Sequence, residues 1–279
     1  MATFAHDGHR LAYTIHGEGP RTCVLLHGLL LSQKMHLPLA TALADRGNRV
    51  ITLDLLGHGR SDRPRDMTEY SMERFGEQTI ALLDHLEIDE TVIAGTSLGA
   101  NVALEAAALA PERVRGMVVE MPVLDNALLG CAIAFTPLMV ALTFGEPVAR
   151  LLGAAARAVP TDSIWAADVL LDLVRQDPAP SAAVLQGLFF GRVAPHKSVR
   201  RTLQAPALVI GHQRDPVHPF SDAGALVEEL PNARLVQADS IIELRISPER
   251  LTGEIAAFLD ECWKPRDRGS AGGRRAGAA

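Results

Sequence analysis

Residues 91–100 read Thr-Val-Ile-Ala-Gly-Thr-Ser-Leu-Gly-Ala, and this stretch decides the fold of the chain. Its first four residues predict a buried strand. The Gly-x-Ser-x-Gly pattern at 95–99 predicts a sharp turn into a helix, because the glycines leave room for a strained backbone around the serine. Ser97 is expected at the helix N-terminus, where backbone N–H groups favour negative charge. We therefore predict that Ser97 is a nucleophile.

Short apolar runs of the same kind recur along the chain and alternate with helical patterns. We predict further strands at Thr22–Leu26, Val50–Leu53, Met117–Val119, Ala207–Ile210 and Arg234–Val236. Their near-continuous hydrophobicity is typical of strands covered on both faces. Helical spacing occurs at Ser71–Leu86, Ser97–Leu109, Ser221–Leu230 and Pro248–Trp263. This alternation predicts an α/β fold with a mostly parallel central sheet flanked by helices.

The ends of some elements carry their own signals. Phe4–His6 and His9–Ile15 are joined at Asp7-Gly8 and predict an antiparallel hairpin at the start of the chain. Ser71 and Ser247 each precede a helical pattern, and we predict that both are N-caps.

The stretch from 124 to 201 interrupts the alternation of strands and helices. It contains helical segments and six prolines but no strand pattern. We therefore predict a helical cap at 124–201, inserted after the sixth strand of a core formed by 1–123 and 202–263. Residues 264–279 are rich in Gly, Ala and Arg without apolar periodicity, which predicts a disordered basic tail.

Composition excludes several classes of protein. The 279 residues are 48% hydrophobic, which is enough for a large core, and the net charge of −6 argues against binding of nucleic acid. Three distant cysteines form no disulfide framework and no zinc motif, and the histidines lack the spacing of metal ligands. We expect a cytoplasmic protein without metal or cofactor.

One segment, 127–144, is uncharged and close to the length that crosses a membrane. Pro137 interrupts it and Gly130 dilutes its apolar character. We interpret the segment as a buried lid of the cap rather than as a membrane-inserted helix.

Two further motifs define a family resemblance. An apolar strand leads into His27-Gly28-Leu29, and residues 54–62 read Asp-Leu-Leu-Gly-His-Gly-Arg-Ser-Asp. Together with the serine turn, they resemble the capped, esterase-like branch of the α/β-hydrolase fold family. The resemblance implies that the backbone N–H groups of Leu29 and Leu98 form an oxyanion hole. It gives the 54–62 loop a supporting role.

The same resemblance implies a Ser–acid–His order along the chain. Asp215 follows the strand Ala207–Ile210, where the family's acid belongs, and Glu120 occupies the alternative acid position after the sixth strand. The family's histidine falls about seven residues before a Pro-Glu pair, and here that position is Ile241. The sequence therefore predicts a catalytic set whose usual histidine is replaced by Ile241.

A missing base matters because a serine hydroxyl is a weak nucleophile at neutral pH. Removing the histidine from a serine protease costs about 2 × 10⁶ in kcat, or roughly 8–9 kcal/mol. Three alternatives stay open: another group acts as base, the chain binds a ligand without turnover, or the site catalyses a lyase or cyclisation step. The candidate bases are His36, His196, His218, Asp239 and Glu243.

The cap sequence indicates what the site accepts. Apolar residues cluster at 128–144, and Phe189, Phe190 and Trp165 add aromatic bulk. A cap of this kind encloses an apolar pocket, although the same residues also suit packing of the cap on the core. We predict a hydrolase of a small apolar ester or acyl substrate acting through Ser97 and Asp215. The alternative is a non-catalytic pseudoenzyme that binds a small apolar ligand and lacks the base histidine.

Overall fold

The computed structural model describes residues 1–159 and 165–265. Eight strands form one sheet in the order β1-β2-β4-β3-β5-β6-β7-β8. The pairs β1/β2 and β2/β4 are antiparallel, and all other pairs are parallel. The strands are β1 Ala2–His6, β2 His9–His16, β3 Arg21–Leu26, β4 Asn48–Asp54, β5 Thr91–Thr96, β6 Val114–Glu120, β7 Ala207–His212 and β8 Ala233–Ala238.

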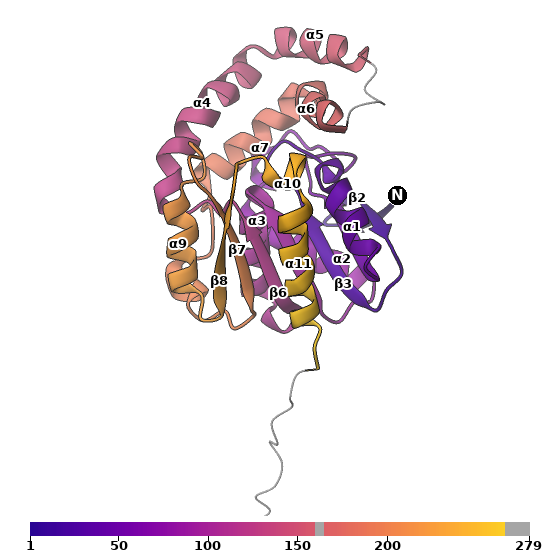
Figure 1. The fold of residues 1–279 in the computed structure, drawn as a ribbon. Helices are drawn as coiled ribbons and strands as arrows, with labels where there is room; N and C mark the ends of the chain where they lie inside the picture. Colours follow the sequence, from indigo (N-terminus) through magenta and orange to yellow (C-terminus); the bar gives the residue numbers. More distant parts are fainter. Residues whose placement is uncertain (160–164, 266–279) are drawn as a thin grey trace, which may run out of the picture.

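Helices cover both faces of this sheet (Figure 1). Buried side chains of α1 and α11 pack on one face, and those of α2, α3 and α9 pack on the other. These core helices are α1 Leu37–Ala44, α2 Met72–His85, α3 Leu98–Leu109, α9 Phe220–Glu229 and α11 Glu249–Cys262. The predicted α/β fold is confirmed, and every predicted strand is present with ends extended by a few residues.

The two predicted helix N-caps had different outcomes. The side chain of Ser71 accepts a hydrogen bond from the backbone N–H of Arg74, which confirms it as the N-cap of α2. The prediction for Ser247 is wrong, because a short helix, α10 Glu243–Ile246, ends there and Pro248 takes the N-cap position of α11. The hairpin turn is confirmed, with Asp7 and Gly8 both at positive φ.

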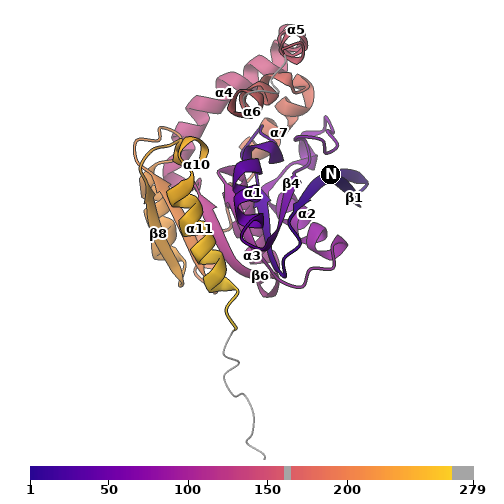
Figure 2. The ribbon, with the colours of Figure 1, turned by 45° about the vertical axis from the view of Figure 1, so that its right-hand side comes forward.

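Between β6 and β7 the chain forms a layer of helices above the body of the fold, as Figures 1 and 2 show. The larger helices of this cap are α4 Leu128–Phe144, α5 Glu146–Arg157, α6 Trp165–Arg175 and α7 Pro178–Phe190. They follow a short 3₁₀ turn, η4 Asp125–Ala127, and precede the short helix α8 Lys197–Arg200. The cap inserted after the sixth strand is therefore present, while the domain boundaries at 124 and 201 stay predictions. The predicted tail lies mostly outside the described residues.

Within the described part of the chain, one helical stretch is long and apolar enough to cross a membrane by length and composition. It is Asp125–Phe144, with a mean hydropathy of 2.1, and only 6% of it is buried. The prediction that this segment is a buried lid is therefore wrong for its outer side. The inner side of α4 packs against α7 and the body of the fold.

Candidate active site

The turn between β5 and α3 places Ser97 as the Gly-x-Ser-x-Gly pattern predicts. Ser97 has φ 54° and ψ −111°, and its backbone N–H donates to the carbonyl of Glu120 at 2.9 Å. A Cβ on Gly95 would overlap the backbone of Gly99, and a Cβ on Gly99 would overlap the carbonyl of Leu26. Only glycine at these two positions lets the turn approach the sheet so closely.

The structure places an imidazole against the Ser97 hydroxyl. The Nε2 atom of His218 lies 2.8 Å from Ser97 Oγ, and its Nδ1 atom lies 2.9 Å from Asp215 Oδ2. An Nδ1–H that donates to Asp215 leaves the lone pair of Nε2 directed at the serine hydroxyl. The three side chains therefore form a continuous Ser–His–Asp hydrogen-bonded chain.

Asp215 and His218 come from one loop after β7, and the loop is held by its own backbone. Asp215 Oδ1 accepts the backbone N–H groups of Val217 at 2.8 Å and of His218 at 2.9 Å. Burial raises the pKa of Asp215, but hydrogen bonds from His218 and from the two N–H groups outweigh it and the net pKa is lowered. The carboxylate is therefore ionised and fixed in position at neutral pH.

The other candidate bases lie elsewhere. His36 is buried, with Nε2 3.0 Å from the carbonyl of Leu26, and burial lowers its pKa to about 4. The side chain of His196 caps α8. Asp239 and Glu243 both form ion pairs with Arg250.

Ile241 lies in the turn between β8 and α10, and 44% of its surface is exposed. That Ile241 replaces the family's histidine stays a prediction. Of the alternatives that the sequence left open, this geometry favours a base from another part of the chain, because His218, one of the candidate bases, contacts the Ser97 hydroxyl. The signal in the sequence was His218 itself, three residues after the predicted acid.

The two predicted oxyanion donors lie beside the serine. Leu29, Ser97 and Leu98 all line one pocket. Leu98 is the first residue of α3, where backbone N–H groups have no partner within the helix. Leu30 has φ 56°, and its carbonyl accepts a hydrogen bond from the side chain of Gln176 in the cap. The loop that carries Leu29 is thus tied to the cap, and the role of the two N–H groups stays a prediction.

Glu120, the alternative acid, belongs to a different cluster. It accepts hydrogen bonds from Thr96 Oγ1 at 2.5 Å and from Arg245 Nη2 at 2.8 Å, and His212 Nε2 lies 3.4 Å away. Burial raises the pKa of Glu120, but the charge of Arg245 outweighs it and the net pKa is strongly lowered. This buried cluster braces β5 directly before the serine.

We expect Glu120→Gln to lower the free energy of unfolding by about 3 kcal/mol at neutral pH, because it leaves Arg245 without its buried carboxylate. Because the pKa of Glu120 is lower in the folded state, its carboxylate stabilises the fold at pH values above the unfolded-state pKa of about 4.3. This stabilisation is lost as the pH falls from that value through the folded-state pKa. The difference between variant and wild type should therefore narrow in acid. Urea unfolding at several pH values measures it. Glu112→Gln, at an exposed site, is the matched control and should change stability by less than about 0.5 kcal/mol.

The pocket in front of Ser97 is apolar and has a volume of about 280 Å³. The cap contributes Leu128, Phe135, Leu185 and Phe189 to its lining. The prediction that apolar cap residues enclose a pocket is therefore confirmed in part. The indole of Trp165, which was also expected there, instead donates to the carbonyl of Lys34, away from the serine. The site thus pairs a polar hydrogen-bonded chain with an apolar enclosure.

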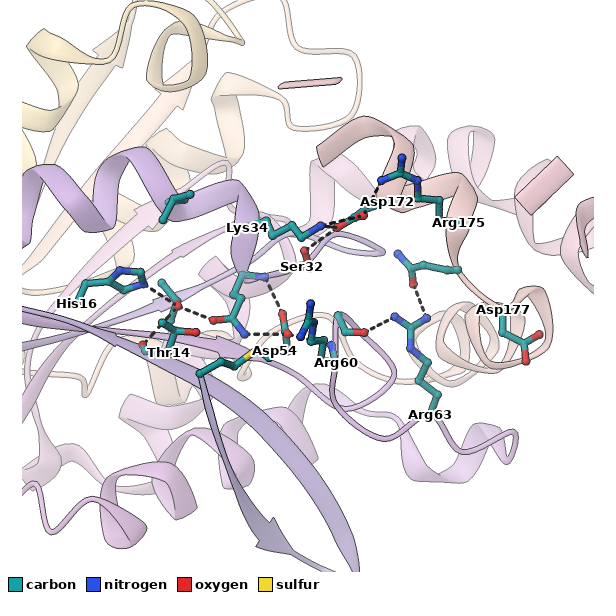
Figure 3. Close-up of a pocket in the computed structure, with 16 residues that line it drawn as sticks. Thr14, His16, Ser32, Lys34, Asp54, Arg60, Arg63, Asp172, Arg175 and Asp177 are labelled. Carbon is teal, nitrogen blue, oxygen red and sulfur yellow. Dashed lines mark hydrogen bonds and ion pairs between the residues drawn. The ribbon is translucent and has the colours of Figure 1, made fainter. Parts of the chain in front are cut away.

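A second cleft of about 740 Å³, lined mainly by residues of polar and charged type, lies between the core and α6 (Figure 3). Lys34 pairs there with Asp168 and Asp172 of the cap, and the side chain of Ser32 donates to Asp172. Ser97 does not line this cleft. The contacts of Ser32 and Lys34 with α6 hold the cap against the 32–34 segment, which follows the loop that carries Leu29.

A central parallel sheet, a serine on a strand–helix turn and a helical cap together define an α/β-hydrolase. The family model of the α/β hydrolase fold matches residues 22–240, and the chain belongs to this family.

The chain is also similar to a curated relative and to solved structures. It is 27% identical over 268 residues to a protein of Mycobacterium phage D29 that is named a non-heme haloperoxidase, covering 90% of this chain and 91% of that one. The structure is similar to the enol-lactonase from Burkholderia xenovorans LB400, with TM-score 0.75, 23% identity and coverage of 93% and 100%. It is also similar to a thermophilic esterase from Thermogutta terrifontis, with TM-score 0.73, 21% identity and coverage of 94% and 97%. At these identities the two structures support the fold alone.

Proposed function

We propose that this protein hydrolyses a small apolar ester or lactone, with Ser97 as nucleophile, His218 as general base and Asp215 as the acid that orients it. The single observation that carries the proposal is the hydrogen-bonded chain from Ser97 Oγ through His218 to Asp215, at 2.8 and 2.9 Å. The esterase and lactonase names among the structural neighbours agree with this reaction class.

The reaction proceeds in two acyl-transfer steps. Ser97 Oγ attacks the ester carbonyl while His218 Nε2 takes the hydroxyl proton, and the carbonyl oxygen becomes an oxyanion held by the N–H groups of Leu29 and Leu98. The ester C–O bond then breaks, and His218 returns the proton to the leaving alcohol. Water attacks the acyl-enzyme by the same route and releases the acid. Asp215 stabilises the imidazolium in both steps.

The pocket points to the chemical class of substrate. Its lining is mainly aliphatic and aromatic, and its small volume suits a short acyl or alkyl group. A sugar or phosphate would leave its polar groups unpaired there.

We place the protein in the cytoplasm as part of the same proposal, since the cysteine spacing suits no disulfide framework.

A fluorophosphonate probe and p-nitrophenyl esters of increasing acyl length test the proposal. Wild-type protein should be labelled at Ser97 and should prefer short acyl chains, whereas Ser97→Ala should be neither labelled nor active. If the wild-type protein neither reacts with the probe nor cleaves any ester, the ligand-binding alternative replaces the enzyme. That alternative rests on the lack of a base, and the contact between His218 and Ser97 supports the enzyme instead.

An Ile241→His variant tests whether His218 acts as the base or whether the base is absent. Because His218 already contacts Ser97, we expect a histidine at 241 to leave kcat for ester hydrolysis within about twofold of wild type. Ile241→Asn is a matched control for adding a polar side chain at this partly exposed position. A rise in kcat of several orders of magnitude in the histidine variant would mean that the base was absent and that the contact with His218 is unproductive.

A further inference from the structure

The outer side of α4 is an apolar stripe exposed to solvent. Leu129, Ile133, Val140 and Phe144 follow one another at helical spacing, and Phe144, Leu129 and Ile133 are 82%, 71% and 68% exposed. No charged residue occurs anywhere in 128–144. The stripe is therefore about one helix face wide and uninterrupted by charge.

The stripe continues onto the next helix. Val148, Leu151 and Leu152 of α5 are also exposed, whereas Gly153 and Ala156 are buried. Figures 1 and 2 both show α4 and α5 along the outer edge of the cap, away from the sheet. We call these seven exposed side chains the outer cap face.

The size of this face is unusual for a monomer. Burying a Val, Leu, Ile or Phe side chain is worth about 1.5–3 kcal/mol, and each Å² of buried apolar surface is worth about 25 cal/mol. Each such side chain therefore corresponds to roughly 60–120 Å² of apolar surface. Seven such side chains, with the small apolar residues between them, approach the ~800 Å² that each partner contributes to a standard interface. The largest apolar patch on a typical monomer is about 300–600 Å². A helix that is apolar on all sides requires a cover on each side.

We propose that the outer cap face is the interface of a homodimer, in which α4 and α5 of a second copy pack on α4 and α5 of the first. A two-fold axis brings the same patch of both copies together, so one self-complementary surface is sufficient. Exposed apolar side chains three, four and seven residues apart form the ridges that a neighbouring helix accepts. The inference does not depend on the proposed hydrolysis.

A second copy suits this face better than a lipid bilayer does. The start of α4 is fixed to the core, because Asp222 accepts the backbone N–H groups of Leu124 and Ala127. The inner side of α4 lines the pocket with Ser97, so α4 cannot leave the fold to span a membrane. Helices that lie on membranes carry a Lys- and Arg-rich polar face. α4 has none. On α5 the exposed Arg150 is paired with Glu146, and the exposed Arg157 donates to the carbonyl of Arg175.

Analytical ultracentrifugation of the 279-residue chain over a wide range of concentration tests the dimer. Wild-type protein should reach twice the monomer mass of 29.9 kDa. Ile133→Glu should raise the dissociation constant by about 100-fold or more, because the two-fold axis buries two like charges in an apolar contact. Phe144→Ser is a second variant, and its exposed position means that the fold of the monomer does not depend on it. Leu109→Glu, exposed on α3 of the core, is the matched control and should dimerise like wild type.

Circular dichroism should show that all variants are folded. The proposal is overturned if the wild-type protein stays monomeric at the highest concentration, or if Ile133→Glu and Phe144→Ser dimerise as tightly as wild type does. It is equally overturned if a monomer floats with phosphatidylcholine vesicles through the outer cap face, since a bilayer would then be the partner.

Discussion

His218→Ala is expected to reduce kcat for ester hydrolysis by about 10⁶, the loss measured when the base of a serine protease is removed. His218 Nε2 lies 2.8 Å from Ser97 Oγ, and among the described residues no other side chain forms a hydrogen bond with this hydroxyl. Without the imidazole the Ser97 proton has no acceptor, and the leaving alcohol has no donor. Labelling by the fluorophosphonate probe should fall with kcat, whereas KM should change little. Steady-state kinetics with a short p-nitrophenyl ester measures both constants.

The control for this variant is His196→Ala, which removes a histidine that only caps α8. It should keep kcat within about twofold of wild type, because surface changes away from a site have small effects. If His218→Ala retained most of its activity, another group would have to take the proton, and the assignment of His218 as base would be wrong. Residual hydrolysis of about 10³–10⁴ over water is still expected from the oxyanion hole and binding.

Asp215→Asn is expected to lower kcat by about 10⁴ while the fold is kept. The amide oxygen can still accept the backbone N–H groups of Val217 and His218, so the loop should hold its shape. The amide N–H₂ group would face His218 Nδ1 and favour the other tautomer of the imidazole. His218 would then present an Nε2–H to Ser97 and could not accept its proton.

Glu120→Gln is the discriminating control for Asp215→Asn. Glu120 was the alternative acid, yet its oxygens are bound to Thr96 and Arg245 rather than to His218. The Glu120 variant should therefore be less stable but keep kcat within a few fold of wild type when assayed well below its unfolding temperature. If Glu120→Gln lost activity and Asp215→Asn kept it, the roles of the two acids would be reversed.

The position of His218, the proposed base, explains why the family pattern did not reveal it. The pattern places the histidine after the last strand, and there the chain has the partly exposed Ile241. Instead, Asp215 and His218 are both carried by the loop after β7, with two backbone N–H groups of that loop bound to the acid. Nothing in local spacing shows that His218 faces the serine turn, because the contact joins residues 121 positions apart.

The cap also has features that the sequence predicts and features that only the tertiary structure shows. Its apolar composition was evident from the residues, and so was its insertion after the sixth strand. Composition does not separate the side chains that line the pocket, such as Phe135, from those that face outward, such as Phe144. α4 is apolar on every side, so periodicity could not mark one side as buried.

The chain by itself determined its strands, its main helices and the serine turn, because these depend on local patterns of apolar residues and on glycine spacing. The tertiary structure decided which imidazole meets the serine, which carboxylate orients that imidazole, and which side of the cap stays exposed. These outcomes depend on the packing of distant segments, and the free energy of that packing is not contained in any short stretch of sequence.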